Sequence, residues 1–212
     1  MPSTPSETST ATPYAPSDFA SRWAAYVARL GMATKFPIVR FVVTDPRVSE
    51  ETSRFLSETG LPDAAGFQFN PKVAGKCLTN VFGGPQGERP GEWENPPARL
   101  RPYLILGFTQ GGDPLCLDTD HQKRREQVII LNHENAFEEA EVVNSGVVQL
   151  AECILIFQEM IEEYQREYGD EAELYEGNMP LPLVERALAR IGRMDKRAAE
   201  EGSYWPAQMQ DI

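Results

Sequence analysis

The stretch that decides the fold is VVNSGVVQLAECILIFQEM, residues 142–160. It begins with two β-branched residues and continues, after Asn144 and Ser145, as an apolar run at helical spacing. Asn and Ser are favoured at helix starts because their side chains accept backbone N–H bonds there. We therefore expect the last strand of a sheet to turn directly into a central helix.

The central helix is predicted to run to Gly169, which can adopt a left-handed cap. At 3.6 residues per turn one side collects Val147, Leu150, Ala151, Ile154, Phe157, Ile161, Tyr164 and Tyr168. Acidic side chains fill much of the other side, where a solvated helix face is the simplest interpretation. Val148, Leu155 and Ile156 lie off the apolar stripe, so the first half of the helix should be covered on more than one side.

Outward from this helix, the chain alternates between short helices and apolar strands. Helical spacing predicts helices from Ser17 or Asp18 to Leu30, over 49–59 and over 182–192. Apolar runs bounded by Gly, Pro and Asp predict strands over 36–44, 67–70, 77–82, 101–109, 114–118, 127–133 and 140–143. The aromatic triplet Tyr204-Trp205-Pro206 could dock the C-terminal end of the chain.

This order of elements predicts an α+β fold, a single domain with an antiparallel-rich sheet and helices packed against it. A parallel sheet would need a helix between successive strands, and residues 101–143 supply none. Residues 1–16 are rich in Ser, Thr and Pro and are predicted to be a disordered tail. The domain then covers 17–212, with 170–212 a helical C-terminal extension, and 83–97 is a Gly- and Pro-rich loop.

The formal net charge of −12 is concentrated in residues 134–176, which hold thirteen acidic side chains against the single Arg166. Such a charge argues against nucleic acid or an anionic membrane as a direct partner, and favours a basic protein. Three widely spaced cysteines cannot all pair within the chain, which favours a reducing compartment. With no signal sequence and no apolar span, we expect a cytoplasmic protein.

The sequence predicts no catalytic, cofactor or metal site. Only His121 and His133 could serve as an imidazole base, and His133 looks like a strand-end residue. Cys153 is embedded in the apolar helix, where a thiol is more often inert core than nucleophile. Asp118, Asp120 and His121 offer oxygen and nitrogen ligands, but the remaining ligands of a metal loop are missing. A metal-dependent enzyme is therefore the weakest of the alternatives.

Three motifs resemble the SUKH superfamily (the SMI1/KNR4-like fold), and within it most closely the SUKH-4 group of bacterial immunity proteins. They are FLSETGLP at 55–62, LGFTQGGDPLCLD at 106–118, and VVNS at 142–145 with its following helix, to which the terminal YWP at 204–206 can be added. The resemblance covers roughly residues 38–160. The 83–97 loop is longer and richer in Pro than the family pattern, and the acidic segment after Met160 departs from it.

The resemblance implies a non-enzymatic immunity protein that binds and neutralises a cognate polymorphic toxin, such as a nuclease or deaminase, by occlusion. An acidic surface suits a toxin whose own substrate groove is basic. The candidate contacts on the loops of the sheet are Asp113, Asp118, Asp120, Glu138, Glu139 and Glu141. The alternative is a regulatory or scaffold protein that binds a cellular protein without inhibiting a toxin.

Overall fold

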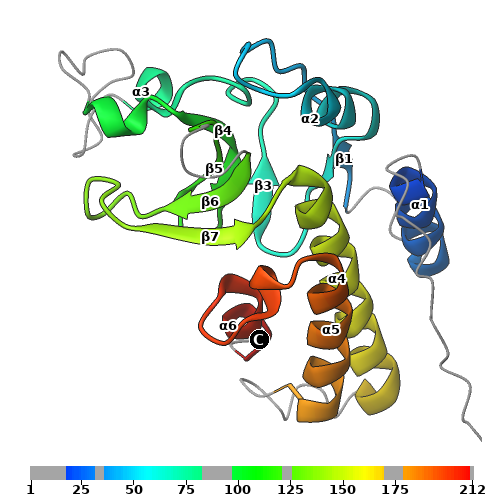
Figure 1. The fold of residues 1–212 in the computed structure, drawn as a ribbon. Helices are drawn as coiled ribbons and strands as arrows, with labels where there is room; N and C mark the ends of the chain where they lie inside the picture. Colours follow the sequence, from blue (N-terminus) through cyan, green and yellow to red (C-terminus); the bar gives the residue numbers. More distant parts are fainter. Residues whose placement is uncertain (1–17, 32–35, 83–96, 121–125, 170–178, 211–212) are drawn as a thin grey trace, which may run out of the picture.

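A computed structural model describes residues 18–31, 36–82, 97–120, 126–169 and 179–210. The tail expected over 1–16, most of the 83–97 loop, the basic loop at 121–125 and the acidic connector at 170–177 lie outside the described residues. The described chain forms a single α+β domain, as predicted from the order of its elements (Figure 1).

A five-stranded antiparallel sheet forms the centre of the domain. Its strands lie side by side in chain order: β3 (Phe67–Phe69), β4 (Tyr103–Thr109), β5 (Pro114–Asp118), β6 (Gln127–Leu131) and β7 (Ala140–Asn144). A β-bulge interrupts the β4–β5 ladder between Ile105 and Gly107. The backbone of β3 passes so close to Gly107 that a Cβ there would stand 2.3 Å from the carbonyl oxygen of Gln68. The close pairing of β4 with β3 therefore requires a residue without a side chain at this position.

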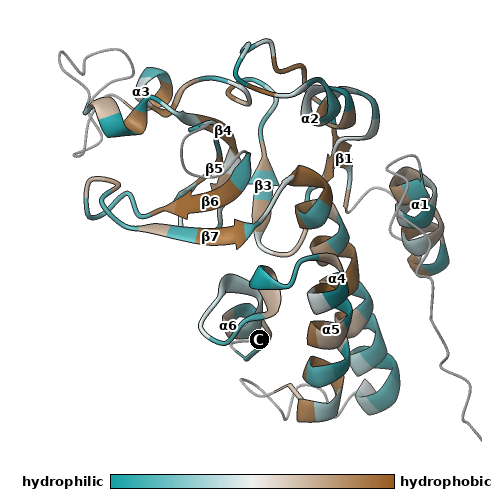
Figure 2. Cartoon of the chain, viewed as in Figure 1, coloured by the Kyte–Doolittle hydropathy of each residue, from teal (hydrophilic) through white to brown (hydrophobic). Residues whose placement is uncertain are grey.

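The two faces of the sheet bury separate clusters of apolar side chains, because successive strand residues point to opposite sides. Leu104, Leu106, Leu115 and Leu117 belong to the large cluster under the helices. Ile105, Cys116, Ile129 and Leu131 belong to a smaller cluster on the other face, closed by Leu78, Leu100 and Phe137. The sheet is thus covered on both sides, and the apolar character of β6 and of the second half of β7 is visible in Figure 2.

The central helix α4 (Val147–Tyr168) packs between α1 (Phe19–Leu30) and α5 (Leu181–Met194) (Figure 1). Its first half is buried nearly all round, including Leu155 and Ile156, as the apolar residues off its stripe predict. The acidic face of α4, expected to be simply solvated, is instead partly covered by the neighbouring helices. Arginines of the flanking helices pair with its carboxylates: Arg22 with Glu152, Arg29 with Glu162, Arg186 with Glu163 and Arg190 with Glu159.

The start of α4 is held by the C-terminal segment and not by an Asn or Ser cap. Gly146 occupies the cap position and no side chain caps the helix. The Asp195 carboxylate, just after α5, instead accepts the Ser145 backbone N–H at 2.7 Å and Asn144 Nδ2 at 3.1 Å. The Asn144 amide oxygen accepts the indole N–H of Trp205 at 3.0 Å. This arrangement, the Asn144 clamp (Asn144, Asp195 and Trp205), ties β7 to the end of the chain.

Several short elements differ from the predictions. The strand expected over 36–44 is reduced to β1 (Ile38–Val39), paired with β2 (Leu61–Pro62). The helix expected over 49–59 is α2 (Glu50–Arg54), capped by Ser49 and continued as a π-helix over Phe55–Thr59.

The strand expected over 77–82 is wrong. Cys77 makes one bridge to Leu104, and α3 (Leu78–Val81) then begins because the N–H groups of Asn80 and Phe82 bond locally to the carbonyls of Cys77 and Leu78. The chain closes with α5, a 3-10 turn at Arg197–Ala199 and α6 (Tyr204–Gln210), which docks its aromatic residues as expected.

Candidate functional site

The six predicted contact residues fall at opposite ends of the sheet. Asp113, in the β4–β5 turn, lies at the same end as the β6–β7 connection that carries Glu138 and Glu139; we call this the turn end. Asp118 is the last residue of β5, and Asp120 follows it at the other end, roughly 16 Å away at about 3.3 Å per residue. The structure therefore does not gather all six into one patch.

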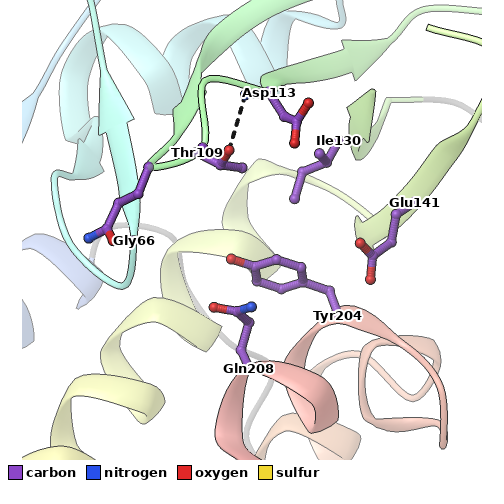
Figure 3. Close-up of a pocket in the computed structure, with 9 residues that line it drawn as sticks. Gly66, Thr109, Asp113, Ile130, Glu141, Tyr204 and Gln208 are labelled. Carbon is purple, nitrogen blue, oxygen red and sulfur yellow. Dashed lines mark hydrogen bonds between the residues drawn. The ribbon is translucent and has the colours of Figure 1, made fainter. Parts of the chain in front are cut away.

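A pocket of about 400 Å³ opens at the turn end, between the sheet and α6 (Figure 3). The end of β4 and the following turn supply Thr109, Gln110, Gly111 and Asp113. We call this pocket the acidic cleft, because Asp113 lies on one wall and a second carboxylate lies across it.

The opposite side of the acidic cleft comes from the last strands and the C-terminal helix. Ile130 of β6 and its partner Glu141 of β7 line it from the sheet, and Tyr204 and Gln208 line it from α6. Of the predicted contact residues, the cleft brings together Asp113 and Glu141. Among the described residues that line it, none is an arginine, lysine or histidine.

Asp113 is held in place by four hydrogen bonds, one of which runs from the Thr109 backbone N–H to the Asp113 carbonyl oxygen at 2.9 Å. Its backbone N–H donates to Thr109 Oγ1 at 3.1 Å (Figure 3), and its Oδ1 accepts the His133 backbone N–H at 2.9 Å. The same Oδ1 lies 2.7 Å from His133 Nδ1. These bonds connect the β4–β5 turn to the end of β6, so this wall of the cleft has a fixed shape.

Glu141 and Tyr204 have polar groups without a hydrogen-bond partner among the described residues. Tyr204 is only 7% exposed, and its ring stacks on Phe67 at a centroid distance of 5.3 Å. Its hydroxyl points across the cleft, away from Glu141 (Figure 3). Burial, with the nearby Glu141 carboxylate second, raises the pKa of Tyr204, and burial raises the pKa of Glu141. Both shifts have the same cause: a poorly hydrated setting disfavours the charged form of each group.

Other carboxylates of the acidic segment are already neutralised within the fold. The four glutamates of α4 described above each pair with an arginine. Unlike Glu138, Glu139 and Glu141, they would have to give up an ion pair in order to bind a cation from another protein. A second hollow, lined by Glu141, Arg197, Glu200 and Glu201, adjoins the acidic cleft. Arg197 Nη1 is buried there with no hydrogen-bond partner in the described part of the chain.

Sequence reasoning missed the contribution of α6 to this site. Tyr204 was expected only to dock the end of the chain, and Gln208 was not singled out. The available signal was the adjacency of Tyr204 and Trp205. In a short helix, neighbouring residues point about 100° apart, so one can reach the core while the other lines a surface pocket.

Within the described residues, no group of three or more His, Cys, Asp or Glu side chains is arranged to hold a metal ion, and His121 lies outside them. All three cysteines are free. Cys153 is fully buried, and burial raises the pKa of its thiol to about 12, so it is a core residue as expected. No helix in the described ranges is long and apolar enough to cross a membrane.

Comparison with known proteins gives one match. The family model described as SUKH-4 immunity protein matches residues 40–211. The matched range runs past Met160, beyond the roughly 38–160 that the resemblance covers, and ends just after α6. No curated protein and no solved structure matches the chain.

Proposed function

Since the chain belongs to the SUKH-4 immunity protein family, we propose that it binds a cognate bacterial toxin domain and neutralises it without catalysing a reaction. The observation that carries the proposal is the family match over residues 40–211, which spans every element that builds the acidic cleft. The toxin class that best fits an acidic binding surface is an enzyme that acts on nucleic acid, such as a nuclease or deaminase.

The proposed mechanism is occlusion by charge mimicry. An enzyme that acts on nucleic acid presents a basic groove to phosphates, and carboxylates at the turn end could take the place of those phosphates. Asp113, Glu138, Glu139 and Glu141 are the proposed contacts at this end. Complementary charge would also speed association, which matters when free toxin is lethal.

Asp118 and Asp120 belong to a separate contact in this proposal, because they lie at the far end of the sheet. A toxin domain of ordinary size can span both ends, since a standard interface covers about 800 Å² on each partner. Their part in binding can therefore be tested separately from that of the turn end.

Co-expression with the toxin domain encoded by the adjacent gene tests the proposal. The expected result is that growth is restored and that the two proteins elute as one complex. A strain that still dies, together with two proteins that elute separately, would contradict the proposed function. Purified complex that lacks toxin activity on its substrate would identify the effect as inhibition and not as reduced toxin expression.

A further inference from the structure

We propose that the acidic cleft is a receptor for one cationic side chain, an arginine or lysine that the bound toxin inserts between Asp113, Glu141 and Tyr204. This inference rests on the proposed function for the source of the cation. It goes beyond a general attraction between acidic and basic surfaces, because it names the pocket, its walls and the chemical group that fills it.

The first support is the hydroxyl of Tyr204, which has no protein partner among the described residues. A polar group on a side chain that is 93% buried normally finds a hydrogen-bond partner. The Tyr204 hydroxyl has none among the described residues and points into the cleft (Figure 3). Packing of the ring against Phe67 and Trp205 fixes its direction, so the hydroxyl stays presented to the open cleft.

The second support is the way this fold treats its other carboxylates. Glu152, Glu159, Glu162 and Glu163 are each paired with an arginine from a neighbouring helix. Glu141, at the surface beside α6, makes no ion pair within the described chain, although Arg197 lines the adjoining hollow. A carboxylate held in such a position without a partner is where an external cation gains most.

The third support is the shape and composition of the cleft. Its volume of about 400 Å³ accommodates a guanidinium or ammonium group with part of its aliphatic stem, and Ile130 offers apolar surface to that stem. The side chains of Gln110 and Gln208 add amide oxygens that can accept from a cation. An anion would instead meet two carboxylates, so it is excluded by repulsion.

Binding of the cognate toxin domain to matched variants tests the inference. Glu141→Gln keeps the shape of the side chain but removes its charge, and we expect the Kd to rise about 10- to 100-fold, the usual range for losing a charge-assisted hydrogen bond. Tyr204→Phe removes only the hydroxyl, and we expect a rise of about 3- to 10-fold. The control Glu200→Gln makes the same charge change in the adjoining hollow and should alter the Kd less than about twofold.

An effect of Glu141→Gln no larger than that of Glu200→Gln would overturn the inference while leaving the proposed function intact. Thermal unfolding of each variant confirms that it is folded. If Tyr204→Phe does not fold, the comparison of Glu141→Gln with Glu200→Gln tests the inference alone, because Glu141 is at the surface and its substitution should not disturb folding.

A second measurement does not need the toxin. Amide chemical shifts of the full chain are followed while N-acetyl-arginine amide, N-acetyl-lysine amide or the neutral N-acetyl-citrulline amide is added. We expect either cationic probe to shift signals from Gly111, Glu141 and Gln208, and the citrulline probe to leave them in place. Shifts that are equal for all three probes, or absent at these residues, would overturn the inference even if no toxin is found to bind.

Discussion

Trp205 Nε1 donates a hydrogen bond to Asn144 Oδ1 at 3.0 Å, and both residues are almost completely buried although they are 61 positions apart. Asn144 ends the last strand and Trp205 lies in the last helix. The Asn144 side-chain amide also donates to the Asp195 carboxylate and to Cys153 Sγ. A single asparagine thus joins the sheet, the central helix and the C-terminal segment.

The Asn144–Trp205 bond should be measurable as a coupling energy. Trp205→Phe leaves the Asn144 oxygen buried without this donor, and we expect a loss of about 1–3 kcal/mol in the free energy of unfolding. Asn144→Ala should cost at least as much, because it also removes one of the two donors to the Asp195 carboxylate. Urea unfolding of both single variants and the double variant should give a coupling of about 1–2 kcal/mol; additive losses would contradict it.

The ion pair of Glu152 with Arg22 predicts an asymmetry between its two partners. Glu152 is 2% exposed whereas the Arg22 side chain is 40% exposed. Arg22→Ala leaves a buried carboxylate without this counter-ion and should cost about 3 kcal/mol. Glu152→Met removes the buried charge and lets Arg22 return to water, so it should cost less than about 1.5 kcal/mol. Equal losses in urea unfolding would show that burial of Glu152 does not set the balance.

Gly107 should not tolerate a side chain. A Cβ there would lie 2.3 Å from the Gln68 carbonyl oxygen and 3.1 Å from the Phe69 ring, so β3 would have to separate from β4. We expect Gly107→Ala to lower the free energy of unfolding by about 3 kcal/mol. The control is Gly111→Ala, whose nearest neighbour would be 3.7 Å away and which should change it by less than about 0.5 kcal/mol.

Glu141 predicts a pH dependence whose sign is opposite to that of a carboxylate in an ion pair. Burial raises its pKa in the folded state, so the folded state binds its proton more tightly than the unfolded state does. Stability is therefore lost as the pH rises from the unfolded pKa, roughly 4.3, through the higher folded pKa. Glu141→Gln should be at least as stable as the native chain at pH 7, and this advantage should disappear below pH 4.

Thermal unfolding of both proteins across this pH range checks the sign. A variant that is less stable than the native chain at neutral pH would mean that the Glu141 carboxylate stabilises the folded state. Glu139→Gln, at an exposed position two residues earlier, serves as the control and should change stability by less than about 0.5 kcal/mol.

The strand-to-helix turn, the antiparallel order of strands and the burial of α4 could be predicted from sequence, because each rests on local periodicity. The cap of α4 could not, since Asp195 is 50 residues from the Ser145 N–H that it accepts. The arginine partners of α4 were missed for the same reason: they come from helices on both sides of it along the chain. The strand expected over 77–82 was wrong because so short an apolar run fits either a strand or a turn of helix.

The acidic residues of the cleft could be predicted from sequence, but the residues that α6 contributes could not. Charge density pointed to Asp113 and Glu141, but it gave equal weight to Asp118 and Asp120, because charge density along the chain does not distinguish the two ends of an antiparallel sheet. Tyr204 and Gln208 enter the cleft only through the tertiary docking of α6. That docking is set by the contact between Trp205 and Asn144, which joins residues far apart in the chain.

The Asn144 clamp has a thermodynamic consequence for the acidic cleft. Tyr204 forms a wall of the cleft and its neighbour Trp205 holds α6 against the sheet, so the cleft exists only while α6 is docked. Occupancy of the cleft and closure of the C-terminal helix are then one linked equilibrium, in which each stabilises the other. The amide protons of α6 should exchange with solvent more slowly when the cleft is filled. Hydrogen exchange in α6 would therefore detect binding at the wall of the cleft that the β4–β5 turn forms.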